Sequence, residues 1–294
     1  MRRLFPVTDQ TVSARTVSAA DREWTLGELA DAYAYPTAAT ATGSGERVEA
    51  GADSGHAGQE GRDGRPGRDG HPAAPLWLRA NMVSTLDGAA HHEGRSQAIS
   101  SPADMRIFGT LRALADAVVV GAETVRLEGY RPARAREAFA ERRAAAGQGP
   151  APVIAVVSAS LELDFSLPLF SGPLVPTLVL TGAAASRERI LAAEKAGAEV
   201  VIAGDGPGVD PARAVRALAD RGLVRLLTEG GPRLLGQFVA AGVLDELCLT
   251  MSPTLASGYA QRIVGGPALA VPERFALASM LEEDGFLFTR YRHI

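Results

Sequence analysis

Polar residues that directly follow short apolar runs are the candidates for chemistry in this chain. None lies in a Gly-x-Ser-x-Gly nucleophile motif, a Walker loop or a Gly-x-Gly-x-x-Gly fingerprint, so an activated serine and the usual phosphate loops are not indicated. Each residue alone is also an ordinary turn former or cap, but their recurrence after four separate runs, beside glycines, predicts a shared cleft. The residues are Asn81, Ser84, Thr85, Asp87, Thr124, Glu128, Ser158 and Glu229.

Residues 223–242, LVRLLTEGGPRLLGQFVAAG, predict where that cleft lies. Residues 224–227 have the apolar character of a strand buried on both faces, and residues 232–242 have the start, spacing and end of a helix. The intervening Glu229-Gly230-Gly231 brings bare backbone N–H groups to the positive end of the helix dipole, which suits a phosphate or diphosphate. A tight turn that needs positive φ is the alternative explanation for the two glycines.

Arg112 is unusual for its position on a predicted helix that Ser100 or Ser101 caps and Pro102 begins. It follows Phe108 by four residues and so lies close to the apolar face, where an unpaired cation is costly. Either its stem snorkels to solvent, or its guanidinium binds a phosphate or a carboxylate in the cleft. The apolar positions at helical spacing are Met105, Phe108, Leu111 and Ala115.

Apolar runs alternate with helical patterns from residue 75 onward. We expect strands at 76–83, 117–120, 153–157, 177–180, 199–202, 224–227 and 247–251, and helices at 102–115, 134–146, 186–196, 211–222 and 232–242. This alternation predicts an α/β fold with a mainly parallel central sheet and helices on both faces. Residues 276–281 and 286–291 flank a Glu-Asp-Gly turn and predict an antiparallel hairpin at the C-terminal edge.

The residues before that domain are predicted to form two different segments. Residues 1–36 contain a short helix with a capping box at Thr25 and Glu28 that ends near Tyr33. This segment is too short to fold alone, so we expect it to pack on the main domain or on a second subunit. Residues 37–74 hold nine glycines between Gly43 and Gly70 and lack Leu, Ile, Phe and Trp, which predicts a disordered linker.

Composition excludes several classes of function. A formal net charge of −4 gives no electrostatic case for nucleic acid, and no apolar stretch approaches the roughly 18 residues of a membrane span. Cys248 is the only cysteine, so no disulfide framework or thiolate cluster is expected, and the sequence predicts a cytoplasmic protein. The five histidines lack metal-ligand spacing and are expected in exposed loops, so no metal site is predicted.

Four segments of the chain resemble one known family. They are 79–88 (RANMVSTLDG), 94–104 (GRSQAISSPAD), 111–132 (LRALADAVVVGAETVRLEGYRP) and 228–247 (TEGGPRLLGQFVAAGVLDEL). In this order they resemble the reductase domain of bacterial riboflavin-biosynthesis deaminase/reductases, a pyrimidine reductase family of the dihydrofolate-reductase-like superfamily. The resemblance covers about residues 76–294, so 75–294 is predicted to be the reductase domain. The zinc-binding motifs of the family's deaminase domain are absent from this sequence.

The resemblance implies a homodimer in which NADPH reduces the ribosyl group of 5-amino-6-(5-phosphoribosylamino)uracil to the ribityl form. We expect the apolar strands 247–251 and 286–291 to supply the paired edge of that dimer. Substrate contacts carried over by motif fall on Ser96, Arg112 and Glu229, with Arg131 or Arg134 a looser match. Cofactor contacts fall on Val83, Ala98, Thr124, Glu128, Ser158, Gly230, Gly231, Pro232, Arg233, Leu234, Leu235, Gly236 and Gln237.

Two departures from the family pattern keep other functions open. The family has Asp-Asp-Pro or Asp-Asn-Pro after its Thr-Val, whereas here residues 126–130, RLEGY, follow Thr124-Val125, with Glu128 in place of the first acid and Gly129 in place of the second. Ala98 stands where many relatives carry an aromatic residue. A reductase of dihydrofolate or another pterin-like substrate is therefore one alternative. A nucleotide-binding protein without catalysis is the other.

Overall fold

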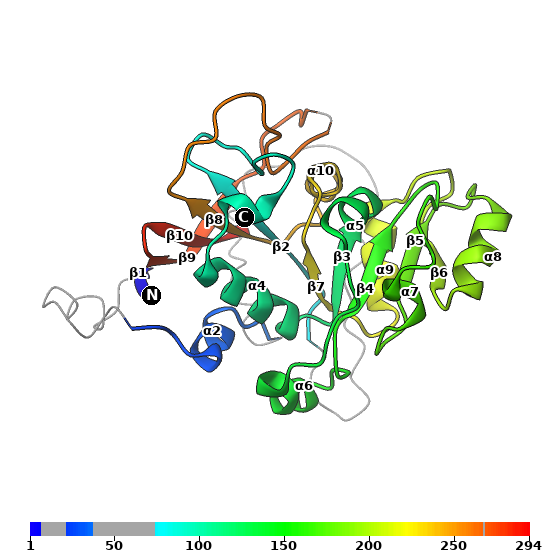
Figure 1. The fold of residues 1–294 in the computed structure, drawn as a ribbon, viewed down its shortest axis with the longest axis horizontal. Helices are drawn as coiled ribbons and strands as arrows, with labels where there is room; N and C mark the ends of the chain where they lie inside the picture. The colour runs from blue at the N-terminus through cyan, green and yellow to red at the C-terminus, as the bar shows by residue number, and fades with distance from the viewer. Residues whose placement is uncertain (7–21, 38–73, 267) are drawn as a thin grey trace, which may run out of the picture.

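The computed structural model describes residues 1–6, 22–37, 74–266 and 268–294. Almost all of the predicted linker, 37–74, lies outside these ranges. Within them a ten-stranded sheet has the order β1-β9-β10-β8-β2-β7-β3-β4-β5-β6 (Figure 1). Its strands are β1 (Arg2–Phe5), β2 (Trp77–Thr85), β3 (Ala117–Gly121), β4 (Val153–Val157), β5 (Leu178–Thr181), β6 (Glu199–Ile202), β7 (Arg225–Thr228), β8 (Glu246–Ser252), β9 (Phe275–Glu283) and β10 (Phe286–His293).

The sheet is parallel from β8 to β6 and antiparallel from β8 to β1, as the alternation of elements predicts. The predicted hairpin is formed by β9 and β10. Two neighbours pair with each of β8 and β10, so neither is the free edge that the dimer hypothesis required. The strand next to β9 is β1, a four-residue strand without a signal in the sequence.

Helices cover both faces of the sheet. They are α2 (Leu26–Ala32), α4 (Pro102–Leu114), α5 (Ala122–Glu128), α6 (Ala140–Ala145), α7 (Pro168–Ser171), α8 (Arg187–Lys195), α9 (Pro211–Ala219) and α10 (Pro232–Ala240), with 3-10 turns at Ser96–Ile99 and Glu137–Phe139. Alternate residues of β3 enter two separate cores, because successive strand side chains point to opposite faces. One core contains α2, α4, α5, α7 and α8, and the other contains α9 and α10. Across the described residues, no helix has both the length and the apolarity needed to cross a membrane.

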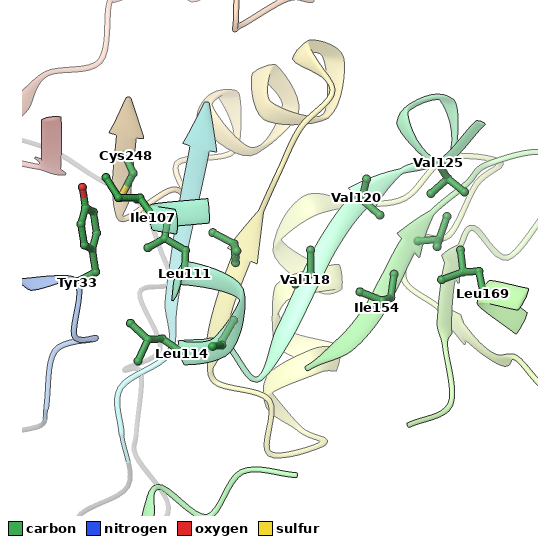
Figure 2. Close-up of a cluster of buried hydrophobic side chains, with 14 of the residues drawn as sticks. Tyr33, Ile107, Leu111, Leu114, Val118, Val120, Val125, Ile154, Leu169 and Cys248 are labelled. Carbon is green, nitrogen blue, oxygen red and sulfur yellow. The ribbon is translucent and has the colours of Figure 1, made fainter. Parts of the chain in front are cut away.

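Helix α4 buries a face that only partly matches its predicted apolar spacing. Ser101 caps it by accepting from the Asp104 backbone N–H at 3.1 Å, as predicted. Its large buried apolar side chains are Ile107, Leu111 and Leu114 (Figure 2), and of the four predicted positions Leu111 and Ala115 are buried. Met105 is half exposed and Phe108 is partly exposed. Both are therefore available to the site described below.

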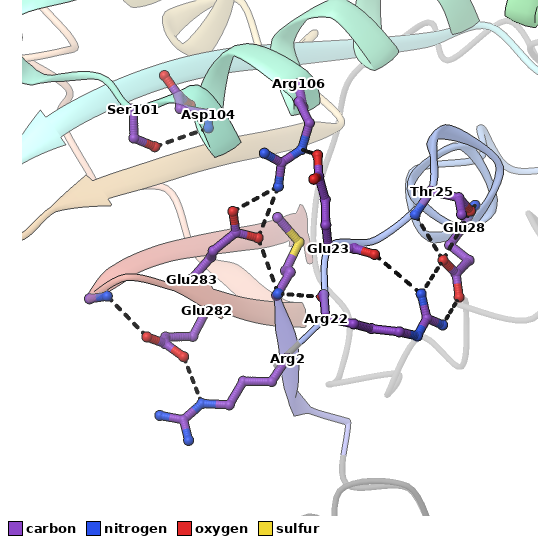
Figure 3. Close-up of polar contacts among 12 residues, drawn as sticks. Arg2, Arg22, Glu23, Thr25, Glu28, Ser101, Asp104, Arg106, Glu282 and Glu283 are labelled. Carbon is purple, nitrogen blue, oxygen red and sulfur yellow. Dashed lines mark hydrogen bonds and ion pairs between the residues drawn. The ribbon is translucent and has the colours of Figure 1, made fainter. Parts of the chain in front are cut away.

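The N-terminal segment packs on the main domain, which was one of its two predicted locations. Helix α2 carries the predicted capping box, in which the Thr25 hydroxyl accepts from the Glu28 backbone and Glu28 accepts from the Thr25 backbone (Figure 3). Tyr33 ends this helix, and its side chain is buried in the core. Arg106 of α4 adds ion pairs to Glu283 of β9 at 2.7 Å and to Glu23 at 3.2 Å.

A buried ionic cluster of Arg79, Glu246 and Arg290 holds the end of this segment. The Arg79 and Arg290 side chains pair with Glu246 at 2.8 and 2.9 Å. Arg79 also donates to the Tyr33 carbonyl at 2.8 Å, and Arg290 donates to the Ala32 carbonyl. Burial alone would raise the pKa of Glu246, but the two guanidinium groups outweigh burial and hold that pKa at about 2. The carboxylate is therefore ionised inside the protein.

Candidate active site

A cavity of about 1400 Å³ lies at the carboxyl ends of the parallel strands. The ends of β2, β3, β4 and β7 open into it, as ligand sites in open α/β sheets do. Much of the remaining wall comes from helices α4 and α5, from the start of α10 and from residues 129–136. Five of the eight strand-end residues, Asn81, Thr124, Glu128, Ser158 and Glu229, share this cleft. Ser84 and Thr85 are buried outside its lining, and Asp87 instead accepts backbone hydrogen bonds from Ala256 and Ser257.

The glycine turn after β7 forms one end of the cavity. Gly230 has φ +88°, and a Cβ atom there would lie 3.4 Å from the Met82 sulfur. The Gly231 backbone N–H donates to the Thr124 hydroxyl at 2.8 Å, and a Cβ on Gly231 would approach that oxygen to 3.0 Å. The turn explanation is therefore confirmed at Gly230, and Gly231 allows the close approach to Thr124.

The N-terminus of α10 follows this turn and faces the cavity. The helix begins at Pro232, and no side chain caps it at Gly231. Arg233 and Leu234, the next two residues, line the cavity. Uncapped amides at the positive end of a nine-residue helix are a suitable cradle for a diphosphate. The residues at this end fit a dinucleotide by their own geometry.

Arg112 and Glu229 form an ion pair in the cavity wall, where Glu229 directly precedes the glycine turn. The Arg112 Nε and Nη2 atoms each donate to a carboxylate oxygen of Glu229 at 2.6 Å, and the Tyr130 hydroxyl donates to the same carboxylate. Burial by itself would lower the pKa of Arg112, but the charge and hydrogen bonds of Glu229 outweigh burial and raise that pKa. The cation near the apolar face is therefore paired with a carboxylate, one of the two kinds of partner expected.

Arg136 is a second cation at this wall, and no pattern in the sequence predicted it as a site residue. The predicted helix 134–146 is replaced by an extended residue at Arg136, the turn Glu137–Phe139 and then α6. The guanidinium lies against Gly109 of α4, where a Cβ atom would overlap Nη1 and stand 3.2 Å from Cζ. Within the described residues the Arg136 side chain forms neither an ion pair nor a hydrogen bond, and its Cζ lies 5.2 Å from the centroid of the Phe139 ring.

The structure brings most of the predicted site residues to the cavity and leaves four away from it. Those that line it are Val83, Ser96, Arg112, Thr124, Glu128, Arg131, Ser158, Glu229, Gly231, Pro232, Arg233, Leu234 and Gln237. Ala98 is exposed outside the lining, Gly230 supports the turn, and Leu235 is fully buried in the core. Gly236 is needed for packing, since a Cβ there would overlap the Gly265 carbonyl oxygen.

Other lining residues were not predicted as site residues. Phe108 and Tyr130 flank the Arg112 guanidinium, with ring centroids 4.5 and 5.0 Å from its Cζ. His91, expected in an exposed loop, is partly buried against the cavity, and its Nδ1 has no hydrogen-bond partner among the described residues. Asp104 also lines the cavity from the first turn of α4.

A mainly parallel sheet with a glycine turn, an uncapped helix start and a large cavity at its strand ends defines an α/β protein of the dihydrofolate-reductase-like fold. The model of the RibD C-terminal domain family matches residues 76–282, and the chain belongs to this family.

Relatives of known sequence and structure agree with that membership. The chain is 29% identical over 179 residues to the 2,5-diamino-6-ribosylamino-4(3H)-pyrimidinone 5′-phosphate reductase of Archaeoglobus fulgidus, covering 60% of this chain and 80% of that protein. It is 32% identical over 157 residues to the protein of the same name from Aquifex aeolicus, covering 53% and 65%. A pyrimidine reductase-like protein from Corynebacterium diphtheriae superposes with a TM-score of 0.67 at 31% identity, covering 74% of this chain and 92% of that one.

Proposed function

We propose that this protein is an NADPH-dependent reductase of riboflavin biosynthesis. Its substrate is a 6-ribosylaminopyrimidine 5′-phosphate, either 5-amino-6-(5-phosphoribosylamino)uracil or the 2-amino pyrimidinone in the names of the relatives, and its product carries a ribityl group. The observation that carries the proposal is that one cavity contains both the uncapped start of α10 after the glycine turn and a wall with several arginine side chains.

The cofactor is assigned to the end formed by the glycine turn. The open amides after Gly231 would hold its diphosphate, and Thr124 and Ser158 lie on the adjacent wall. When bound, NADPH supplies a hydride to the ring-opened C1′ of the substrate, while the neighbouring nitrogen takes up one proton from solvent or the protein. Ala98, Leu235 and Gly236 are withdrawn from this assignment because they do not line the cavity.

The substrate is assigned to the wall that contains Arg112, Glu229 and Arg136. Glu229 is oriented by Arg112 and Tyr130 and has lone pairs left to accept from a sugar hydroxyl. Arg136 supplies an unneutralised guanidinium for the 5′-phosphate, and the exposed Arg131 and Arg134 lie on the same wall. Catalysis then rests mainly on positioning and on exclusion of water, with no covalent intermediate.

Steady-state oxidation of NADPH tests the proposal. We expect turnover with a ribosylaminopyrimidine phosphate and none with dihydrofolate. Turnover of dihydrofolate alone would favour the pterin-reductase alternative, and binding of NADPH without turnover of any of these compounds would favour the non-catalytic alternative. The homodimer is part of the same proposal, and light scattering on the eluting protein checks it.

A further inference from the structure

Asp104 is a buried carboxylate in the cavity wall without a cation to balance it. The residue is 6% exposed, and its two oxygens accept from the Ser100 hydroxyl at 2.6 Å and the Thr250 hydroxyl at 2.7 Å. In the part of the chain that the structure describes, no arginine, lysine or histidine pairs with it. Burial raises the pKa of Asp104, and the hydroxyl groups offset only part of this effect. Such a group is costly to the fold unless a ligand uses it.

Asp104 begins a row of three cavity residues along α4. Phe108 and Arg112 follow at intervals of four residues, so the row is about 12 Å long at 1.5 Å per residue. Arg136 lies against Gly109, one residue past Phe108 in the direction of Arg112, and Arg112 itself is paired with Glu229. The row therefore presents a carboxylate, then an aromatic ring, then a cationic end at which Arg136 has no ionic partner among the described residues.

An extended ribosylaminopyrimidine phosphate has matching polarity. Its phosphate belongs at the cationic end by charge, and its heterocycle then falls beside Phe108 with one edge toward Asp104. The two candidate heterocycles differ at that edge. A 2-amino-4-pyrimidinone presents N3–H and the 2-amino group side by side, two donors for two carboxylate oxygens. A uracil presents N3–H beside the C2 carbonyl, which would face a carboxylate oxygen.

We propose that Asp104 binds the 2-amino and N3–H edge of the substrate and selects the 2-amino pyrimidinone over the uracil. The inference rests on the proposed function and specifies its substrate. Each oxygen of Asp104 keeps a free lone pair after its hydroxyl bond, so both can accept from the ligand. A site built for two donors rejects an analogue that replaces one donor with an acceptor, because a buried polar group is then left facing like charge.

The test compares kcat/KM for the two phosphorylated substrates in the wild type, in Asp104→Asn and in the control Asp205→Asn. We expect the wild type to prefer the 2-amino pyrimidinone by at least about tenfold. Asp104→Asn offers an amide donor to the C2 carbonyl, so the preference should fall at least about tenfold or reverse. Asp205 pairs with Arg213 on the surface, away from the cavity, and its substitution should leave the ratio unchanged.

Three results would contradict the inference or its basis. A wild-type enzyme that uses the uracil equally well or better overturns the selection and leaves the reductase function intact. An equal loss of kcat/KM for both substrates in Asp104→Asn, with unchanged NADPH affinity, would show that Asp104 has only a structural role. Consumption of neither substrate by the wild type removes the proposed function itself. The wild-type ratio needs no variant, so the inference stays testable even if Asp104→Asn does not fold.

Discussion

Replacement of Gly109 by alanine would displace Arg136 from the cavity wall without removing its charge. The added methyl group overlaps Nη1 and stands 3.2 Å from Cζ and 3.5 Å from Nη2 of Arg136. These atoms are the far end of a flexible side chain, so the guanidinium moves and the helix does not. Gly109 lies inside α4, where alanine favours the helix by about 0.5–1 kcal/mol. We therefore expect the free energy of unfolding to stay constant or to rise by up to about 1 kcal/mol.

The same substitution should weaken binding of the substrate phosphate. A hydrogen bond to a charged group contributes about 1.5–3 kcal/mol, which corresponds to a roughly 10- to 100-fold rise in KM for the phosphorylated substrate. The dephosphorylated substrate should show little change. Urea unfolding followed by circular dichroism measures the first effect, and initial rates of NADPH oxidation measure the second. A gain of stability together with a loss of phosphate affinity cannot come from general damage to the fold.

Gly27→Ala is the matched control for this experiment. Gly27 is exposed inside α2, and a Cβ atom there would meet nothing closer than the Thr25 hydroxyl at 3.8 Å. It should gain similar stability with no change in KM, whereas Arg136→Ala should reproduce the KM effect of Gly109→Ala. An unchanged KM in both cavity variants would refute the assignment of Arg136 to the phosphate.

The remaining predictions concern the ionic cluster and the glycine turn. Glu246→Gln leaves Arg79 and Arg290 buried without their carboxylate, so it should cost about 3–5 kcal/mol of unfolding free energy and lower the thermal midpoint by roughly 6–10 °C. Because the pKa of Glu246 is lowered from 4.5 to about 2, its contribution is fully present above pH 4.5 and is lost as the pH falls toward 2. The unfolding free energy of Glu246→Gln should therefore change less than that of the wild type as the pH falls from 4.5 toward 2. Identical pH dependence in the two proteins would contradict the ionised state of Glu246. Gly231→Val adds bulk where a Cβ already approaches Thr124 to 3.0 Å, so the Kd for NADPH should rise by at least about tenfold with an unchanged circular dichroism spectrum; unchanged affinity would remove the cradle from the cofactor site.

Local signals were sufficient to predict the glycine turn and helix start at one end of the cavity. The glycines, Pro232 and the helical spacing after them all lie within twenty residues of sequence, and the structure confirms the strand, turn and helix there. The sheet class followed in the same way from the alternation of strand and helix patterns. Such features depend on residues that are neighbours in the chain, so a single sequence contains the necessary information.

The wall that contains Arg112, Glu229 and Arg136 is formed by contacts between distant parts of the chain, so the sequence could not predict it. Arg112 was singled out because a cation near an apolar face needs a partner, but Glu229 is 117 residues away, and the sequence did not identify the pair. Asp104 falls in the predicted helix 102–115 and Arg136 in the predicted helix 134–146, and neither position indicates a site residue. Their shared position on one wall is set by the packing of α4 against the chain before α6, which no short window of sequence reports.

The ionic cluster also sets limits on how this protein can be divided. The family match spans residues 76–282, yet Arg79 and Arg290 donate to backbone carbonyls at the end of α2, and β10 continues to His293 between β8 and β9. An excised fragment with the boundaries of the family match would lack the acceptor carbonyls at one end and a central sheet partner at the other. We therefore expect the smallest fragment that folds to extend beyond the family match at both ends, and truncation studies should retain both flanks.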